Sequence, residues 1–533
     1  MSDSRILFRD VQIVDGTGGP AYRGNVVVSE GVIAEIRGGS GRSEDEIIDG
    51  EGLTLSPGFI DVHSHLDFTV EDNPHCANLA AQGITLAVAG NCGYSAGPIG
   101  EEMAEYQETR GRTASVGSLG DWFARISRSG IGINVASYVG QGNLRGDVMG
   151  VGALGPPDPS QLAKMRTLLA DALREGAFGL STGRDYVPGC YSEPEEITRV
   201  AAELGNHPGS FYVSHLLDES AGLVEATEEA LEIGKAAGVP TLLSHHKAVV
   251  PSNRGLTKES LALVDSAVEA GLDVRLDAYP YDFSATIHLL DMLPTRLTNP
   301  GEEDVMRTLR DEELFAPVAR DLHEGYPGWT SALADFEWGY TILQSPGFPE
   351  MAGLTVGEIA TKWNVDPAEA VRQLVLADGG TAVCSLTMSE EDVSRVLAHP
   401  LTAVCTDSAA MDTPRGNFRS SVHPRSYGTY PRFFARYVRE EKLLSLEEGV
   451  RRCSGLPASW LGLDDRGVIK PGARADLVLF DPEGISDTAT LENPTGAPRG
   501  IRMVMIDGRI AVMDGRNTGI LAGSVIKRSD SAR

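Results

Sequence analysis

Long apolar runs are missing from this chain of 533 residues, and its six cysteines form no Cys-x-x-Cys pair. A membrane helix needs about 18 consecutive apolar residues, which no segment supplies. The N-terminal residues lack the charged and then apolar pattern of a secretion signal. Cysteines scattered in this way exclude a disulfide framework and a zinc ribbon. We therefore expect a cytoplasmic protein without a membrane partner.

Basic residues are also scarce. The 46 Lys and Arg residues face 75 Asp and Glu residues, which gives a net charge of −29. Such a charge opposes binding to nucleic acid or to an anionic membrane surface, because both are negatively charged. A small anionic substrate would need a local basic pocket. The oligomeric state has no signal in the sequence.

The two ends of the chain are rich in short β-strands. Alternating runs separated by glycine occupy residues 1–57, and similar runs with Asp-Gly turns occupy residues 466–533. Similar ends that flank a different middle predict one small β-sandwich domain made from both termini. The chain is longer than one hydrophobic core usually supports, which agrees with a second domain over residues 58–465.

The middle of the chain alternates short apolar strands with helical segments, a pattern typical of a parallel barrel or a doubly wound sheet. Eight strands are expected, the number of a TIM-like (β/α)8 barrel, so the fold class is α/β. The gap from Ser284 to Pro400 predicts an insertion after strand seven, at about residues 287–350. The run at 380–386 competes for the eighth place. The expected strands cover residues 59–65, 84–93, 133–142, 177–183, 211–216, 240–246, 273–281 and 401–408.

Polar residues collect where these strands end. The first strand carries His63 and His65, whose spacing places both rings on one face. On that stretch alone, two hydrogen-bonded histidines explain the pattern as well as a metal site does. Barrel enzymes build their sites at the carboxyl ends of the strands, so several polar ends together favour a metal site. The other polar ends are Asn91 and Cys92, His215, His245 and His246, Tyr279 and Tyr281, and Asp407.

These residue types suggest the metal and the chemistry. Imidazole, thiolate and carboxylate donors together suit Zn²⁺ better than Mg²⁺ or Ca²⁺. Zinc keeps one oxidation state, so we expect hydrolysis by a metal-activated water. Asp407 is the candidate general acid/base that passes a proton from this water to the leaving group. His246 is expected to face away from His245, in a packed or hydrogen-bonded position.

Several motifs resemble those of one known family. The stretch "PGFIDVHSHLD" opens the barrel, and "GNCGYSAGP" (90–98), "LSHHKA" (243–248), "DAYPYDFSAT" (277–286) and "HPRSYGTYPRFFARYVRE" (423–440) follow in order. On these motifs the chain resembles the amidohydrolase superfamily and, within it, the N-acyl-D-amino-acid deacylases, or D-aminoacylases. The resemblance covers nearly the whole chain. It implies a zinc hydrolase that removes the acyl group from N-acyl-D-amino acids.

The resemblance also implies roles for individual residues. One zinc ion would be tightly bound, and a weaker second metal position would share a cysteine with it. The tight position would be held by Cys92, His215 and His245, and the weaker one by His63, His65 and Cys92. Asp407 would be the general acid/base. A substrate carboxylate in an acidic protein needs fixed cations, and the residues implied to hold it are Lys247, Tyr186, Tyr279 and Arg425.

Some positions depart from the family pattern. Leu217 stands close behind His215 where relatives commonly have an Arg, and Gln141 replaces a His. Ala285 occupies a place where relatives often have a carboxylate-binding Ser. The segment 407–425 is also longer than usual. These departures affect the substrate specificity more than the zinc chemistry.

Three functions are therefore compared. The first is the N-acyl-D-amino-acid deacylase, whose partner is a small amide that carries a carboxylate. The second keeps the zinc chemistry but acts on a carbamoyl, cyclic-amide or secondary-metabolite amide, which the departures favour. The third is a catalytically silent amidohydrolase scaffold. The intact set of Cys92, His215, His245 and Asp407 argues against the third.

Overall fold

The structure is a computed structural model. It describes most of the chain, with short gaps at both ends and between several elements. The described residues are 5–37, 46–109, 112–294, 297, 302–326, 331–378, 381–385, 388–412, 422–491 and 493–528.

Eight short apolar strands form a barrel, within the part of the chain that the structure describes. All residues of β7 (Ile84–Ala89) and β11 (Phe211–His215) are buried, as expected when both faces of a parallel sheet are covered. The other barrel strands are β6 (Phe59–Asp61), β8 (Asn134–Ser137), β10 (Gly179–Gly183), β12 (Thr241–Leu243), β13 (Val274–Ala278) and β17 (Thr402–Val404).

The barrel strands pair in parallel and in chain order. β6, β7 and β8 form one run, and the second run starts at β9 (Val139–Gly140), directly after β8, and continues through β10 to β13 and β17. A parallel bridge between Ser64 and Ser408 joins the ends of β6 and β17 and closes the ring. The expected (β/α)8 barrel is confirmed. The first strand is shorter than expected, because β6 ends at Asp61 and not at residue 65.

Helix α5 (Pro159–Glu175) shows how the sequence sets the outer layer. Asp158 caps its first turn through its side chain, and Gly176 ends it with a φ of 119°. Leu162 and Met165, three residues apart, are buried on one face. Of the helices in the described residues, none is long and apolar enough to span a bilayer. Further helices are α1 (Ala77–Ala80), α2 (Glu101–Thr109), α3 (Leu119–Ser129), α4 (Gln141–Met149), α6 (Pro194–Ala201), α7 (Leu223–Ala237), α8 (Leu256–Glu269), α15 (Glu390–Ala398), α16 (Arg425–Arg432), the π-helix Phe433–Glu440, α17 (Leu446–Cys453) and α18 (Gly455–Trp460).

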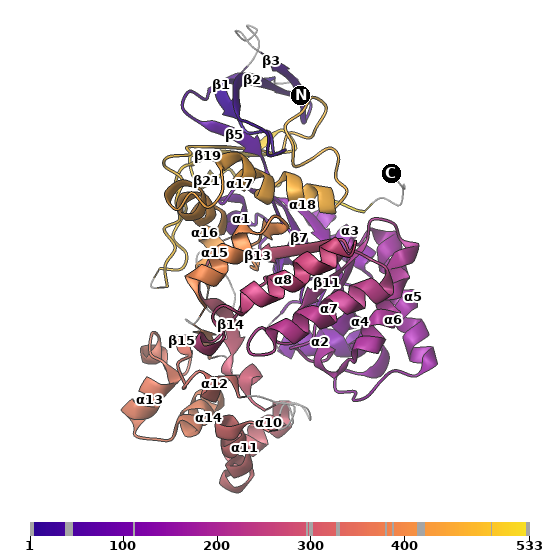
Figure 1. The fold of residues 1–533 in the computed structure, drawn as a ribbon, viewed down its shortest axis with the longest axis vertical. Coiled ribbons are helices and arrows are strands. Elements are labelled where there is room, and N and C mark those ends of the chain that lie inside the picture. The colour runs from indigo at the N-terminus through magenta and orange to yellow at the C-terminus, as the bar shows by residue number, and fades with distance from the viewer. Residues whose placement is uncertain are drawn as a thin grey trace.

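Strands from both ends of the chain meet in one sheet, which has nine strands in the described part. β5 (Thr54–Pro57) and β18 (Leu477–Phe480) join the two ends by antiparallel pairing. The expected β domain of both termini is confirmed, and its first strands lie at the top of Figure 1. Its boundaries after residue 57 and before residue 466 stay predictions. The other strands are β1 (Ile6–Ile13), β2 (Tyr22–Ser29), β3 (Val32–Arg37), β4 (Glu46–Asp49), β19 (Ile501–Ile506), β20 (Arg509–Met513) and β21 (Arg516–Asn517).

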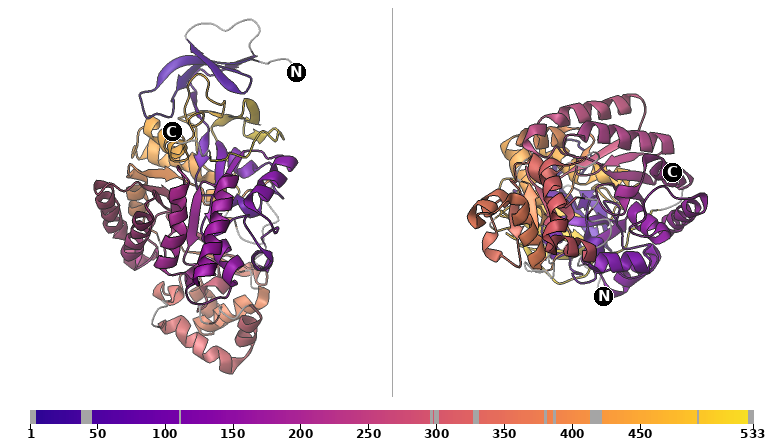
Figure 2. Two further views of the ribbon diagram at one scale, coloured as in Figure 1. Left: turned by 90° about the vertical axis from the view of Figure 1, so that its right-hand side faces the viewer. Right: turned by 90° about the horizontal axis from the view of Figure 1, so that it is seen from below.

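The segment between β13 and β17 forms a separate lobe. β14 (Ser284–His288), β16 (Ala382–Ser385) and β15 (Thr341–Gln344) pair antiparallel in that order, so β16 is not a barrel strand. Buried residues from Leu289 to Val383 form a core of the lobe's own. The lobe lies at the opposite end of the molecule from the terminal β domain (Figures 1 and 2). Its helices are α10 (Glu302–Arg310), α11 (Glu312–Glu324), α12 (Ala332–Asp335), α13 (Val356–Trp363) and α14 (Pro367–Asp378).

Aromatic rings join the barrel to the terminal β domain. The fully buried ring of Phe59 in β6 lies 5.2 Å from the ring of Tyr430 and 5.3 Å from that of Phe434, measured between centroids. Phe480 of β18 packs against the same ring, edge-on, at 6.5 Å. One side chain therefore contacts both the helical layer and the β domain.

We predict that Phe59→Ala lowers the free energy of unfolding by about 3–5 kcal/mol, because it removes these contacts and leaves a cavity. The urea midpoint followed by circular dichroism checks this. Ile47→Ala is the control, since Ile47 is 47% exposed and an exposed change shifts stability by only about 0.5 kcal/mol. Equal midpoints for the two variants would contradict the assigned role of Phe59.

Candidate metal centre

Hydrogen bonds join the loop after the first barrel strand to the loop after the last one. One carboxylate oxygen of Asp61 accepts the backbone N–H groups of His63 at 3.2 Å and of Thr406 at 3.0 Å. The N–H of Asp407 donates to the carbonyl oxygen of His63 at 2.9 Å. His63 and His65 therefore lie in a loop, and hydrogen bonds rather than strand geometry fix their positions.

Three of the predicted site residues have a left-handed backbone. The φ angle is 52° at Cys92, 33° at His245 and 48° at Asp407. This conformation costs a non-glycine residue about 1–3 kcal/mol and is concentrated at functional sites. At the Cys92 turn the next residue must be glycine, because φ is 79° at Gly93 and a Cβ there would lie 2.7 Å from the backbone nitrogen of Gly183.

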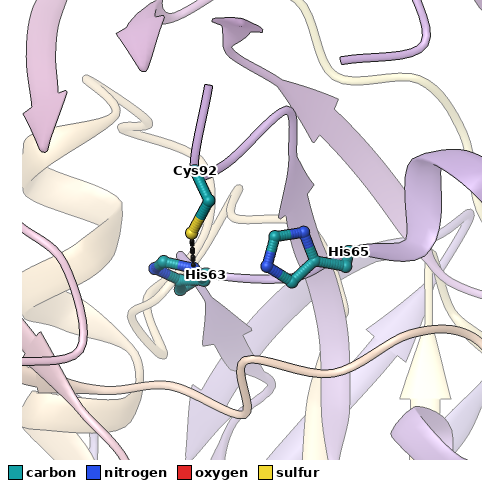
Figure 3. Close-up of side chains that lie close together, drawn as sticks. All are labelled: His63, His65 and Cys92. Atoms are coloured by element: carbon teal, nitrogen blue, oxygen red, sulfur yellow. Dashed lines mark hydrogen bonds between the residues drawn. The ribbon is translucent and has the colours of Figure 1, made fainter. Parts of the chain in front are cut away.

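Cys92 lies at the centre of a buried cluster. Its Sγ is 3.3 Å from Nε2 of His63, 3.5 Å from Nδ1 of His215 and 3.5 Å from Nε2 of His245. The same two nitrogens of His215 and His245 lie 2.9 Å apart. Figure 3 shows the sulfur directed at the His63 ring, with the His65 ring next to it. The structure thus brings the five predicted metal ligands together.

Asp407 borders the same cluster. One of its oxygens lies 3.2 Å from Nε2 of His65 and 3.6 Å from Nε2 of His63. Overlapping sets of three ligand atoms lie within 4.8 Å of one another. These sets are His63, His65 and Cys92; Cys92, His215 and His245; and His63, His245 and Asp407.

Both acidic groups of the cluster are held in their charged forms. Burial by itself would raise the pKa of Cys92, but His63 and the other neighbouring imidazoles hold it well below the usual thiol value. Burial would likewise raise the pKa of Asp407, but Arg425, His65 and His63 keep it well below the usual carboxyl value. A thiolate and a carboxylate are the forms that bind a metal.

Two further carboxylates support the histidines. An oxygen of Asp277 accepts the backbone N–H of His245 at 2.7 Å and lies 3.4 Å from Nδ1 of His63. Glu219 lies 2.8 Å from Nδ1 of His245 and 2.6 Å from Nζ of Lys247. The sequence did not predict a role for either. The available signal was their place in motifs that carry the family resemblance, "DAYPY" for Asp277 and "VSHLLDES" (213–220) for Glu219.

The four predicted substrate-binding residues surround this cluster. Lys247 Nζ and Arg425 Cζ lie 5.6 and 4.8 Å from the ring centre of Tyr279. The guanidinium of Arg425 lies 2.9 Å from an oxygen of Asp407. The ring of Tyr186 is 4.8 Å from that of His215. Two cations and two phenols are therefore placed beside the candidate ligands.

Further predictions concern the orientation of His246 and the positions that depart from the family pattern. His246 donates or accepts a hydrogen bond with Ser260 of α8 at 2.8 Å, as its outward position predicts. Gln141 is buried and donates to Ser192 and Glu196. Leu217 is 41% exposed. The side chain of Ala285 and residues 413–421 of the long segment lie outside the described residues.

The chain is similar to known proteins over most of its length. A protein-family model described as "Amidohydrolase family" matches residues 46–324 and 405–512. The N-acyl-D-aspartate deacylase of Alcaligenes xylosoxydans xylosoxydans is 33% identical over 95% of this chain and 91% of its own length. The N-acyl-D-glutamate deacylase of the same organism is 34% identical over 93% of this chain and 91% of its own length.

The fold is also similar to that of a solved deacylase structure. The N-acyl-D-glutamate deacylase of Bordetella bronchiseptica was crystallised with zinc and a phosphonate inhibitor that mimics the tetrahedral intermediate. Its fold matches with a TM-score of 0.80 at 32% identity, over 99% of this chain and 100% of that one. The resemblance read from the motifs is thereby confirmed: the chain belongs to the amidohydrolase family, among its N-acyl-D-amino-acid deacylases.

Proposed function

We propose that the protein is a zinc-dependent hydrolase that cleaves the amide bond of N-acyl-D-amino acids. The observation that carries the proposal is the buried cluster of Cys92, His215 and His245 beside Asp407, in a chain similar to deacylases over nearly its whole length. The substrate is a small molecule. The expected cytoplasmic location and the absence of a nucleic-acid partner stay predictions.

The donor set fits zinc. Thiolate sulfur and imidazole nitrogen are ligands that Zn²⁺ prefers, whereas Mg²⁺ and Ca²⁺ select oxygen. We assign the tight position to Cys92, His215 and His245. We assign the weaker position to His63, His65 and Cys92. The sulfur of Cys92 would therefore belong to both positions.

Residues of the chain supply the proton transfer. A bound zinc ion would act as a Lewis acid that makes the acyl carbon more electrophilic and water easier to deprotonate. Asp407, held ionised, accepts the proton of the attacking water and gives it to the nitrogen as the C–N bond breaks. The products are a carboxylate and a free amine, so one water is consumed for each amide.

The substrate carboxylate would bind beside this site. Lys247 and Arg425 supply the positive charge, and Tyr186 and Tyr279 supply hydroxyl donors and ring surface. In the structure each cation faces a protein carboxylate, Glu219 or Asp407. The substrate carboxylate would therefore join ion pairs that already exist.

A second candidate keeps this chemistry but changes the substrate to a carbamoyl, cyclic or secondary-metabolite amide. The exposed Leu217 favours it, since no guanidinium follows His215 to contact a substrate carboxylate. The two candidates share the metal centre and differ in the group that is bound next to it.

We predict that Asp407→Asn retains zinc but loses turnover by about 10²–10⁴-fold, because the amide cannot carry the proton. Zinc content by mass spectrometry and kcat for an N-acyl-D-amino acid, measured on the same sample, test this. Turnover at the wild-type level would remove Asp407 from the acid/base role.

We predict that Cys92→Ala loses most of its bound zinc, because the sulfur is common to both proposed positions. Cys453→Ala is the matched control, since Cys453 is also buried but lies outside the clusters of ligand atoms. Zinc per chain should fall only in the first variant. A Cys92→Ala protein that keeps its zinc would refute the ligand assignment.

A substrate panel separates the two candidate functions. The zinc content of the purified protein is measured first, and the same sample is then incubated with N-acetyl-D- and N-acetyl-L-amino acids to measure amine release. We expect turnover of D forms only. Zinc without turnover of any member would discard the D-amino-acid substrate in favour of another amide, and a protein without zinc would favour a silent scaffold.

A further inference from the structure

Glu219, like Asp407, contacts a proposed zinc ligand and a proposed substrate-binding cation at the same time. Its Oε1 lies 2.8 Å from Nδ1 of His245 and 2.6 Å from Nζ of Lys247. The three side chains are 12%, 3% and 7% exposed, so water screens these contacts little. The contacts thus join the metal centre to the basic side of the site.

The ring of His245 can use Glu219 in only one way when a metal is bound. Its Nε2 faces the cluster, 3.5 Å from the sulfur of Cys92 and 2.9 Å from His215. A metal ligand needs the lone pair on that nitrogen, so the proton must be on Nδ1, which can then only donate. Lys247 also only donates, so the carboxylate of Glu219 is the acceptor for both.

The backbone fixes Glu219 in this place. The carbonyl oxygen of Glu219 accepts the N–H of Val249 at 2.9 Å, which ties the loop after β11 to the loop after β12. The neighbouring Asp218 accepts the N–H groups of Ser220 at 2.6 Å and Gly222 at 3.1 Å. Glu219 therefore lies in a turn that is held on both sides.

We propose that Glu219 is a positioning residue: it fixes the tautomer and orientation of His245 for zinc binding, and its charge holds Lys247 beside Tyr279. The inference rests on the proposed function, because it assumes that His245 binds zinc. Carboxylate partners of this kind usually change metal affinity by about 10–100-fold when they are removed. Glu219 takes no part in the proton transfer, which belongs to Asp407.

The test measures zinc affinity, by competition with a chelating dye, together with steady-state kinetics at saturating zinc. Glu219→Ala should weaken zinc binding by about 10–100-fold. Glu219→Gln should recover most of this loss, since its amide oxygen can still accept a hydrogen bond from the Nδ1–H of His245. At saturating zinc both variants should keep most of the wild-type kcat, as expected for a residue that acts through another.

Two further variants separate the metal role from other effects. Lys247→Met should raise KM. It should lower zinc affinity less than Glu219→Ala does, because Glu219 can still accept a hydrogen bond from His245, although the donation of Lys247 to the carbonyl oxygen of His245 at 3.0 Å is lost. Glu196→Gln is the matched control, since Glu196 also forms a buried ion pair, with Arg145, away from the cluster. It should lower the melting temperature without changing zinc affinity.

Unchanged zinc affinity in Glu219→Ala would overturn this inference alone, provided that the wild-type protein binds zinc. An equal loss of affinity in Glu196→Gln would also overturn it, since the effect would then not be specific to the contact with His245. A wild-type protein that binds no zinc would overturn the proposed function as well.

Discussion

The site depends on the burial of negative charge among histidines. A thiolate and a carboxylate removed from water are costly unless cations, hydrogen-bond donors or a metal surround them. Here the sulfur of Cys92 contacts three imidazoles, and Asp407 contacts two imidazoles and the guanidinium of Arg425.

The barrel supplies the frame for this arrangement, and the loops supply the geometry. His215 is the last residue of β11, whereas the other proposed ligands and Asp407 follow the ends of their strands. Left-handed residues at Cys92, His245 and Asp407 turn the chain into the site. Buried carboxylates then accept hydrogen bonds from the backbone of these loops. Asp61 joins the first and last loops, and Asp277 holds the backbone of His245.

The barrel could be predicted from the sequence because buried parallel strands appear as continuous apolar runs. The ligands could be predicted because polar residues stand at the ends of these runs, where barrel enzymes place their sites. The sequence pattern placed His63 and His65 on a strand face, yet both lie in a loop after Asp61. Local pattern could not reveal this, since bonds to Thr406 and Asp407, far along the chain, shape that loop. Glu219 was missed for the same reason, because its contacts cross between two loops.

The bridge between Ser64 and Ser408 has a consequence for folding. The bridge closes the seam between the first and the last barrel strand. Across this seam the backbone N–H of Thr406 donates to Asp61, which lies 345 residues away in the chain. Closing so long a loop costs more chain entropy than pairing two strands that are neighbours in the sequence. His63 and His65 stand on one side of the seam and Asp407 on the other. A chain whose ring is still open therefore lacks a complete centre, so hydrolysis begins only with the finished fold.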